Sequence, residues 1–136
     1  MKLHHTGFVI KNIDTWEINM VYEKKIADIY DPVQNARLAL YSNYSDTMIE
    51  LIQPHNERAF TWNSLMKYGN HFNHFCYEID DYSDLNTIVS KMRMIKVLGP
   101  VPALLFDMRE VVFYFTKNSQ IVEFLINKIQ SDFKRE

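Results

Sequence analysis

The feature of this sequence that most constrains its fold is an internal duplication. "HTGFVIKNIDTW" (residues 5–16) and "HFCYEIDDYSDL" (residues 74–85) share a layout, in which a histidine opens an apolar segment, an Asn or Asp follows seven residues later and a helix cap follows nine residues later. Two later segments, "MIELIQ" and "IVEFLI", also correspond, because each holds a glutamate among aliphatic residues. The duplication predicts two copies of one strand–helix–strands unit, with a histidine near its start and a glutamate near its end.

Strand signals dominate both copies. Runs of β-branched, aromatic and aliphatic residues predict strands at residues 2–10, 36–42, 47–53, 71–79, 111–116 and 120–126. The polar turn "NYSD" joins the second of these strands to the third, and "KNS" joins the fifth to the sixth. Both connections indicate antiparallel hairpins.

Three helices are expected between these strands. The first begins at Asp14 and extends to Lys25, with Glu17 placed to complete a capping box. The second lies within residues 57–69 and ends at Gly69. The third begins at Ser83, and its apolar side chains repeat at helical spacing on one face: Leu85, Ile88, Val89 and Met92.

The 136 residues are enough for one domain, and the scarcity of glycine (3) and proline (4) leaves no flexible linker to divide the chain. We expect a single domain over residues 1–136. Its parts are a first module at about 1–55, a connecting helix at about 56–70, a second module at about 71–127 and a polar tail at 128–136. The tail is expected to be a short terminal helix or disordered.

Composition excludes several functional classes. A net charge of −2 and a pI near 6.2 give no electrostatic reason to expect nucleic acid or an anionic membrane as partner. The single cysteine, Cys76, excludes an intrachain disulfide and a multi-cysteine metal site, and its side chain is expected to be buried. The N-terminal segment does not resemble a signal peptide, and no apolar stretch approaches the ~18 residues of a membrane span. We therefore expect a cytoplasmic protein.

Two histidines and two glutamates recur in register: His5 with Glu50 and His74 with Glu123. Each glutamate lies in a strand whose two faces are both apolar, where an isolated carboxylate needs a partner or a raised pKa. Two imidazoles and two carboxylates that converge would supply a nitrogen and oxygen site for Zn²⁺, Ni²⁺, Co²⁺, Mn²⁺ or Fe²⁺.

The alternative is that these residues are incidental to function. A single histidine on a strand is more often a core or surface residue than a ligand. His4, His55 and His71 are interpreted in that way, with His71 as the nearest competitor for the ligand role. The joint recurrence of the two pairs, and not any one residue, favours a metal site.

The segments "LHHTGFVIKNID", "MIELIQP", "FNHFCYEIDDYSD" and "IVEFLI" together resemble the vicinal oxygen chelate superfamily (glyoxalase/bleomycin resistance/dioxygenase) over nearly the whole chain. This superfamily includes glyoxalase I, methylmalonyl-CoA epimerase and the extradiol dioxygenases. The resemblance implies an α+β fold of two tandem βαβββ modules, with curved mixed sheets around a metal site. It also implies a homodimer.

Carried over by position, the resemblance implies metal ligands at His5 on the first strand, Glu50 on the fourth, His74 on the fifth and Glu123 on the eighth. His5 matches, and not His4, because the family's histidine stands two residues before a glycine, here Gly7.

The resemblance leaves three functions open. The first is a glyoxalase I-like lyase or isomerase, in which a small substrate chelates the metal through vicinal oxygens and reacts through an enediolate, with Glu123 as base assisted by Glu50. The second is an acyl-CoA epimerase such as methylmalonyl-CoA epimerase, which needs a further carboxylate on the third strand. The expected third strand, "NARLALYS", contains no acid. The third is a non-catalytic module that binds a small molecule.

The segment before the last glutamate holds candidates for a pocket wall: Phe106, Arg109, Phe113 and Phe115. Arg109 either meets an anionic substrate or is a solvated arginine of a hairpin.

Overall fold

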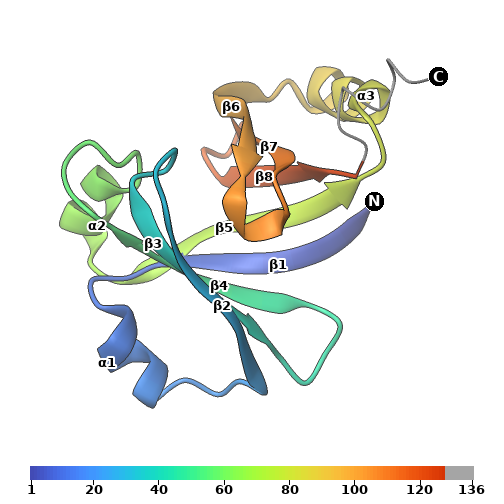
Figure 1. The fold of residues 1–136 in the computed structure, drawn as a ribbon. Coiled ribbons are helices and arrows are strands. Elements are labelled where there is room, and N and C mark those ends of the chain that lie inside the picture. Colours follow the sequence, from blue (N-terminus) through green and yellow to red (C-terminus); the bar gives the residue numbers. More distant parts are fainter. Residues whose placement is uncertain (128–136) are drawn as a thin grey trace. The chain divides into compact units, whose positions relative to one another are not determined.

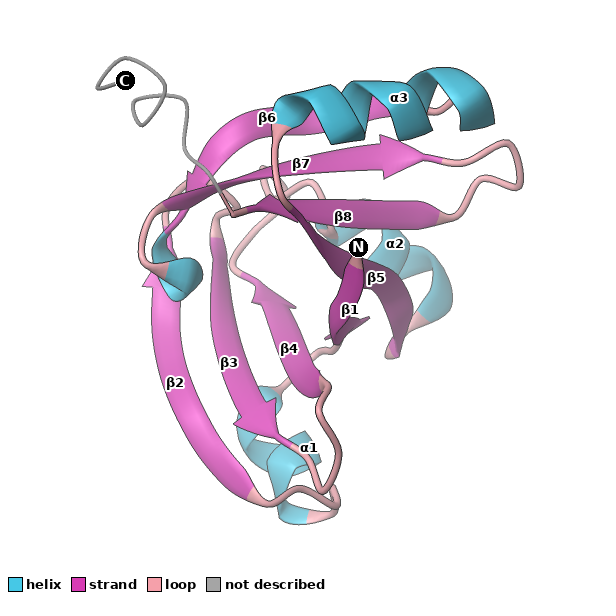
Figure 2. Cartoon of the chain, turned by 90° about the vertical axis from the view of Figure 1, so that its right-hand side faces the viewer, coloured by secondary structure: helices cyan, strands magenta, loops and turns pink. Residues whose placement is uncertain are grey.

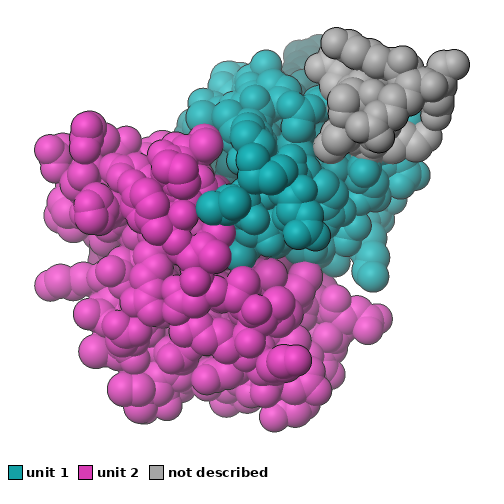
Figure 3. Space-filling view, viewed as in Figure 1, with its two compact units in different colours: residues 1–4, 74–136 teal, residues 5–73 magenta. Residues whose placement is uncertain are grey.

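The computed structural model describes residues 1–127, so the tail expected at 128–136 lies outside the described residues. The chain divides into two compact units, coloured separately in Figure 3. Unit 2 comprises residues 5–73, and unit 1 comprises residues 1–4 together with the chain from residue 74 onward. The expectation of a single domain with the module boundaries given above stays a prediction.

Figure 1 follows the elements along the chain. The first copy of the duplicated unit contains β1 (Lys2–Val9), α1 (Ile13–Ile18), β2 (Lys24–Asp31), β3 (Ala36–Ser42) and β4 (Met48–Pro54). Helix α2 (Trp62–Tyr68) follows. The second copy contains β5 (His71–Ile79), α3 (Tyr82–Met92), β6 (Ile95–Ala103), a 3-10 turn (Leu104–Phe106), β7 (Arg109–Phe115) and β8 (Ile121–Ile126). The order βαβββ occurs twice, which confirms the α+β class and the tandem modules.

In unit 2, the strands are arranged in the order β2-β3-β4-β1, with β1 parallel to β4 and the other pairs antiparallel. Helix α1 covers one face of these strands (Figure 1). The buried side chains on that face form one cluster: Ile10, Ile13, Ala39, Tyr41 and Leu51. Because strand side chains alternate, His5 and Glu50 lie on the opposite face.

Unit 1 repeats this arrangement with the order β5-β8-β7-β6, in which β5 is parallel to β8. Helix α3 runs beside these strands in Figure 2 and contributes Leu85 to a second cluster. The other members lie on the side of the strands that the helix covers: Ile79, Val112, Tyr114, Val122, Phe124 and Ile126. His74 and Glu123 lie on the face away from α3. In each unit, the helix therefore buries the apolar face of the sheet and leaves the His–Glu face for another role.

The first helix begins earlier and ends earlier than the sequence predicts. Its N-cap is Asn12, whose side chain accepts a hydrogen bond from the Thr15 backbone at 3.0 Å, and its last residue is Ile18. The predicted capping box at Asp14 is wrong, because Glu17 accepts a hydrogen bond from the Tyr41 hydroxyl at 2.9 Å and pairs with the Lys25 ammonium at 2.9 Å. A tertiary partner on the neighbouring strands competes here with the local cap.

The third helix is displaced in the same way. Its N-cap is Asp81, which accepts a hydrogen bond from the Asp84 backbone at 3.0 Å, and not the predicted Ser83. Asn12 and Asp81 stand seven residues after His5 and His74, so the structural caps are the seventh positions of the repeat and not the ninth. Helix α2 ends at Gly69, as predicted.

Two strands, β2 and β6, have no counterpart among the strands predicted from local patterns. The expected first helix overlaps the start of β2, which pairs antiparallel with β3 through a register shift between Lys25 and Ala27. Strand β6 contains Gly99, Pro100 and Pro102, which are poor strand formers. Among the described strands, β6 is the last in the order β5-β8-β7-β6 and pairs with β7 alone. An edge strand of this kind tolerates proline, because one of its two sides forms no backbone hydrogen bonds with another strand.

Within residues 1–127, no helix is long and apolar enough to cross a membrane.

Candidate metal centre

The first His–Glu pair lies in unit 2. Strand β1 runs parallel to β4 so that Gly7 stands opposite Glu50, and His5, two residues before Gly7, shares its face of the sheet. The Nε2 atom of His5 lies 3.6 Å from Oε1 of Glu50, and the two residues are 0% and 2% exposed. Their proximity comes from strand register, since 45 residues separate them in the chain.

The second pair lies in unit 1 and is built in the same way. Strand β5 runs parallel to β8 so that Cys76 stands opposite Glu123, and His74, two residues earlier, shares the face of Cys76. The Nε2 atom of His74 lies 3.0 Å from Oε1 of Glu123, and the residues are 0% and 1% exposed. The structure therefore brings each histidine together with the glutamate of its own copy, in equivalent positions.

Each glutamate also has a neighbour on the antiparallel strand beside it, and both of these neighbours are apolar. Leu40 of β3 stands opposite Glu50, and Phe113 of β7 stands opposite Glu123. The Phe113 ring also meets the His74 imidazole edge to face, with ring centroids 5.7 Å apart and an interplanar angle of 81°. Strand β3 carries no carboxylate, as its sequence shows. Each carboxylate thus has an apolar side chain opposite it on the neighbouring antiparallel strand.

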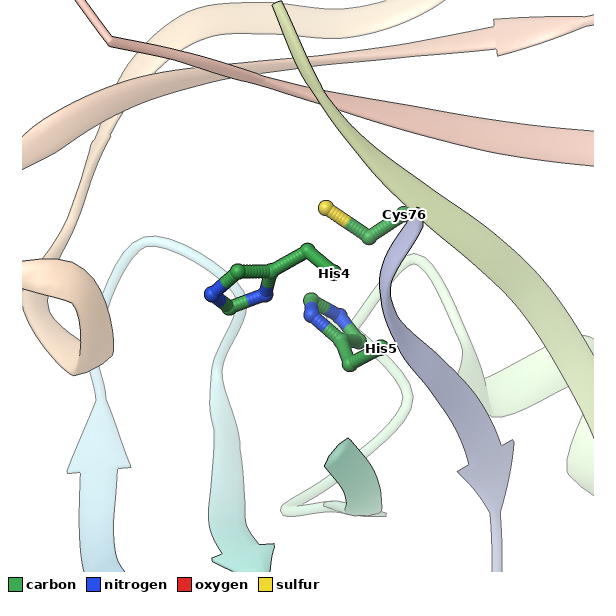
Figure 4. Close-up of side chains that lie close together, drawn as sticks. All are labelled: His4, His5 and Cys76. Carbon is green, nitrogen blue, oxygen red and sulfur yellow. The ribbon is translucent and has the colours of Figure 1, made fainter. Parts of the chain in front are cut away.

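A polar cluster that sequence reasoning missed lies in unit 1. His4, interpreted above as incidental, is 7% exposed, packs edge to face on the Phe106 ring and places Nε2 4.0 Å from Oε1 of Glu78. Figure 4 shows its side chain close to that of Cys76, which is buried as predicted, with His5 next along β1. The alternation of β5 could have identified Glu78, because it stands two residues after Cys76 and four after His74 on one face.

The other histidines are accounted for by local contacts. The Nδ1 atom of His71, the nearest competitor, lies 2.7 Å from the Gly69 carbonyl oxygen, and its ring packs on Tyr68. His55 is exposed and packs edge to face on Tyr30. Neither residue joins one of the buried His–Glu pairs.

The four candidates for a pocket wall separate into two groups. Phe106 and Phe113 are buried against His4 and His74, respectively. Arg109 opens β7 on the face that bears Phe113, whereas Phe115, at the other end of the strand, is 39% exposed.

The donor set of each pair fits a divalent metal ion. Two ligand atoms that are each about 2.1 Å from one ion lie about 3.0–3.4 Å apart. The N–O distance of the His74–Glu123 pair, 3.0 Å, lies within this range, and that of the His5–Glu50 pair, 3.6 Å, lies just above it. A buried pair of polar groups by itself is a weak source of stability, because removing both groups from water offsets their attraction. Two such pairs at equivalent positions therefore indicate a function other than stabilising the fold.

The family model described as the glyoxalase/bleomycin resistance protein/dioxygenase superfamily matches residues 3–122. No curated protein matches the chain.

Solved structures share the fold at low sequence identity. A hypothetical protein of Bacillus halodurans C-125 has a TM-score of 0.79 at 20% identity, over 95% of this chain and 96% of its own. Methylmalonyl-CoA epimerase from Mycobacterium tuberculosis has a TM-score of 0.79 at 16% identity, over 97% and 91%. A variant of the Streptomyces coelicolor methylmalonyl-CoA epimerase, in complex with 2-nitronate-propionyl-CoA, has a TM-score of 0.75 at 16% identity, over 95% and 99%.

Proposed function

Because the chain belongs to the glyoxalase/bleomycin resistance protein/dioxygenase superfamily, we propose that it is a metal-dependent enzyme of the glyoxalase I kind, a lyase or isomerase similar to lactoylglutathione lyase. Its substrate is a small molecule with two neighbouring oxygens. The observation that supports this proposal is the presence of one buried His–Glu pair in each copy of the duplicated unit, at equivalent register positions.

We propose that His5, Glu50, His74 and Glu123 are the ligands of one divalent ion, which is Zn²⁺, Ni²⁺, Co²⁺, Mn²⁺ or Fe²⁺. The neutral imidazoles and the carboxylates form a donor set that suits these ions. When bound, the ion would polarise the two vicinal oxygens of the substrate and lower the free energy cost of removing a proton from the adjacent carbon.

Within this proposal, Glu123 is the base. Its carboxylate takes the proton from the hemithioacetal carbon that bears sulfur, which leaves an enediolate, and returns the proton to the neighbouring carbon. The product is the thioester of an α-hydroxy acid, so one carbon is oxidised and its neighbour reduced with no external oxidant. Glu50 assists this transfer, and Phe113 keeps water from the Glu123 carboxylate.

An acyl-CoA epimerase is the second candidate, and the likeness to methylmalonyl-CoA epimerases over more than nine-tenths of the chain is the observation that favours it. Epimerisation by two bases needs an acid on each side of the reacting carbon. The face of β3 that meets Glu50 offers Leu38 and Leu40 instead. We therefore place the epimerase second, and a non-catalytic module that binds a small molecule third.

One experiment distinguishes the glyoxalase-like enzyme, the epimerase and the non-catalytic binding module. The protein is loaded with each candidate metal and assayed with methylglyoxal plus glutathione for thioester formation, and with methylmalonyl-CoA in deuterated water for exchange at the α-carbon. Thioester formation that is lost in Glu123→Gln supports the glyoxalase-like proposal. Exchange without thioester formation supports the epimerase, and a metal-bound protein that does neither contradicts both enzyme proposals.

The proposal also covers the assembly and the cellular location of the protein. We propose a homodimer in the cytoplasm. Light scattering coupled to gel filtration should give about twice the 16.3 kDa mass of one chain, and a monomer at micromolar concentration would contradict the dimer.

A further inference from the structure

Arg109 lies on the same face of the unit 1 strands as the His74–Glu123 pair. In β7, Phe113 stands opposite Glu123, Val111 stands opposite Leu125, and Arg109 comes two residues before Val111. Four residues of strand separate Arg109 from Phe113, which corresponds to about 13 Å along the strand. The arginine therefore shares a sheet face with the candidate metal ligands but lies two side-chain rows away from them.

The backbone and a neutral side chain hold one edge of the Arg109 guanidinium. Its Nε donates a hydrogen bond to the Phe106 carbonyl oxygen at 3.4 Å, and its Nη1 donates one to Oδ1 of Asn127 at 3.1 Å. The Asn127 side chain is itself fixed, because its Nδ2 donates a hydrogen bond to Oδ1 of Asp80 at 3.3 Å. Among residues 1–127, the direction of the guanidinium is therefore set by these two hydrogen bonds, neither of which involves a carboxylate.

The nearest acid to Arg109 in this cluster is Glu78, and it is shared. Its Oε2 lies 3.9 Å from Nη1 of Arg109, which is too long for a hydrogen bond, and its Oε1 lies 4.0 Å from Nε2 of His4. The side chains of Arg109 and Glu78 are 31% and 26% exposed, whereas those of His74 and Glu123 are 0% and 2% exposed. Within the part of the chain that the structure describes, the positive charge is thus fixed in direction, partly open to solvent and only loosely paired with Glu78.

We propose that Arg109 binds an anionic group of the substrate, a carboxylate or a phosphate, and that this residue selects substrates by charge. The planar guanidinium fits either group through paired N–H donors. Together with the proposed function, on which this inference rests, it defines the substrate class: a conjugate with two vicinal oxygens at one end and a negative group on the order of 10 Å away.

The binding test uses two pairs of probes, in each of which one member carries the anionic group and the other lacks it. S-methylglutathione is compared with its diethyl ester, and S-methyl phosphopantetheine with S-methyl pantetheine, by calorimetry on the metal-loaded protein. We expect Arg109→Gln to weaken binding of an anionic probe by about 10- to 100-fold, which is the contribution of a hydrogen bond to a charged group, and to change binding of the probes without the anionic group less than twofold. The pair that shows the effect tells a carboxylate from a phosphate.

Two further variants control this test. Arg109→Lys keeps the charge but loses the paired donors and should fall between the wild type and Arg109→Gln. Arg93→Gln removes the same charge from an exposed residue at the C-terminal end of α3 and should leave all affinities unchanged. Circular dichroism and the melting temperature confirm folding of each variant.

The outcomes separate this inference from the proposed function. Equal affinity of wild type and Arg109→Gln for both charged probes, or no binding of either charged probe to the wild type, overturns the role of Arg109 whatever the enzyme activity. A charge-dependent loss of affinity in a protein that turns over no hemithioacetal supports the role of Arg109 and contradicts the glyoxalase-like proposal.

Discussion

The Nε2 atom of His74 lies 3.0 Å from Oε1 of Glu123, although 49 residues separate the two along the chain. The parallel register of β5 and β8 creates this relationship, because Cys76 stands opposite Glu123 and places His74 on the same face. A slip of one residue would move Glu123 to the face that α3 covers, among apolar side chains. The register is therefore specified both by the apolar cluster and by the polar pair on the opposite face.

The first prediction concerns metal content. The purified protein should bind about one divalent ion per chain, and removing the ion with a chelator should lower the melting temperature, because a ligand at a thousand times its Kd stabilises the folded state by about 4 kcal/mol. His74→Ala should reduce the bound metal measured by mass spectrometry, whereas His55→Ala, at an exposed histidine, should retain it. Equal metal content in the two variants would contradict the ligand role of His74.

The second prediction separates the two glutamates. Glu123→Gln should lower kcat by about 10²–10⁴-fold, the range of a general base, with an unchanged circular dichroism spectrum. Glu50→Gln should lower metal affinity and reduce kcat less, because we propose that Glu50 is a metal ligand that only assists the base. Glu57→Gln, at an exposed position, is the control. Steady-state kinetics at saturating metal distinguish these roles, and an active Glu123→Gln would show that another residue is the base.

The third prediction tests the aromatic support of His74. Phe113→Leu removes the edge-to-face contact with the imidazole, a contact worth about 0.5–1.5 kcal/mol, so the dissociation constant of the metal should rise about 2- to 13-fold. Phe115→Leu makes the same change two residues further along β7, where the ring is 39% exposed, and should leave metal affinity unchanged. Competition with a chromophoric chelator measures both constants.

The fourth prediction concerns acid stability. The hydrogen bonds from Arg37, at 2.7 and 2.9 Å, hold the pKa of Asp28 at about 2, below its ordinary value of 3.8. A depressed folded pKa stabilises the protein above the unfolded pKa, and this contribution is lost as pH falls from about 4 to about 2. After allowance for solvent screening of this partly exposed pair, Arg37→Gln should lower the free energy of unfolding by about 1 kcal/mol at pH 7.

The control for that prediction is the pH at which the two proteins converge. Urea unfolding of the wild type and Arg37→Gln should give free energies of unfolding that differ at pH 7 and converge below pH 2, where Asp28 becomes protonated in the folded as well as the unfolded state. A difference that persists unchanged at pH 2 would assign the loss to the packing of the Arg37 side chain and not to its charge.

Local sequence patterns were sufficient to predict most of the strands. The predicted range 36–42 coincides with β3 and 71–79 coincides with β5, because alternating apolar residues reflect a period that neighbouring residues alone determine. The same patterns failed for β2 and β6. Strand β2 has exposed residues at alternate positions, and β6 contains two prolines, so pairing with β3 and β7 stabilises segments whose own composition is a weak signal.

Part of the candidate site was also predictable from the sequence. The repeat identified His5, Glu50, His74 and Glu123 because the duplication compares positions within one sequence. It gave no information on His4, Glu78 or Arg109, because their approach depends on side chains of β1, β5 and β7 that have no counterpart in the repeat.

The sequence by itself determined the duplication, the alternation of most strands and the residue types of the candidate ligands, since all of these depend on local spacing. The tertiary structure decided how closely each histidine approaches the glutamate of its own copy, which cap begins each helix and which face of each sheet stays free for the polar pair. These features depend on parallel strand pairing between segments more than forty residues apart. Such pairing is fixed by the burial of whole sheet faces, which no short stretch of sequence encodes.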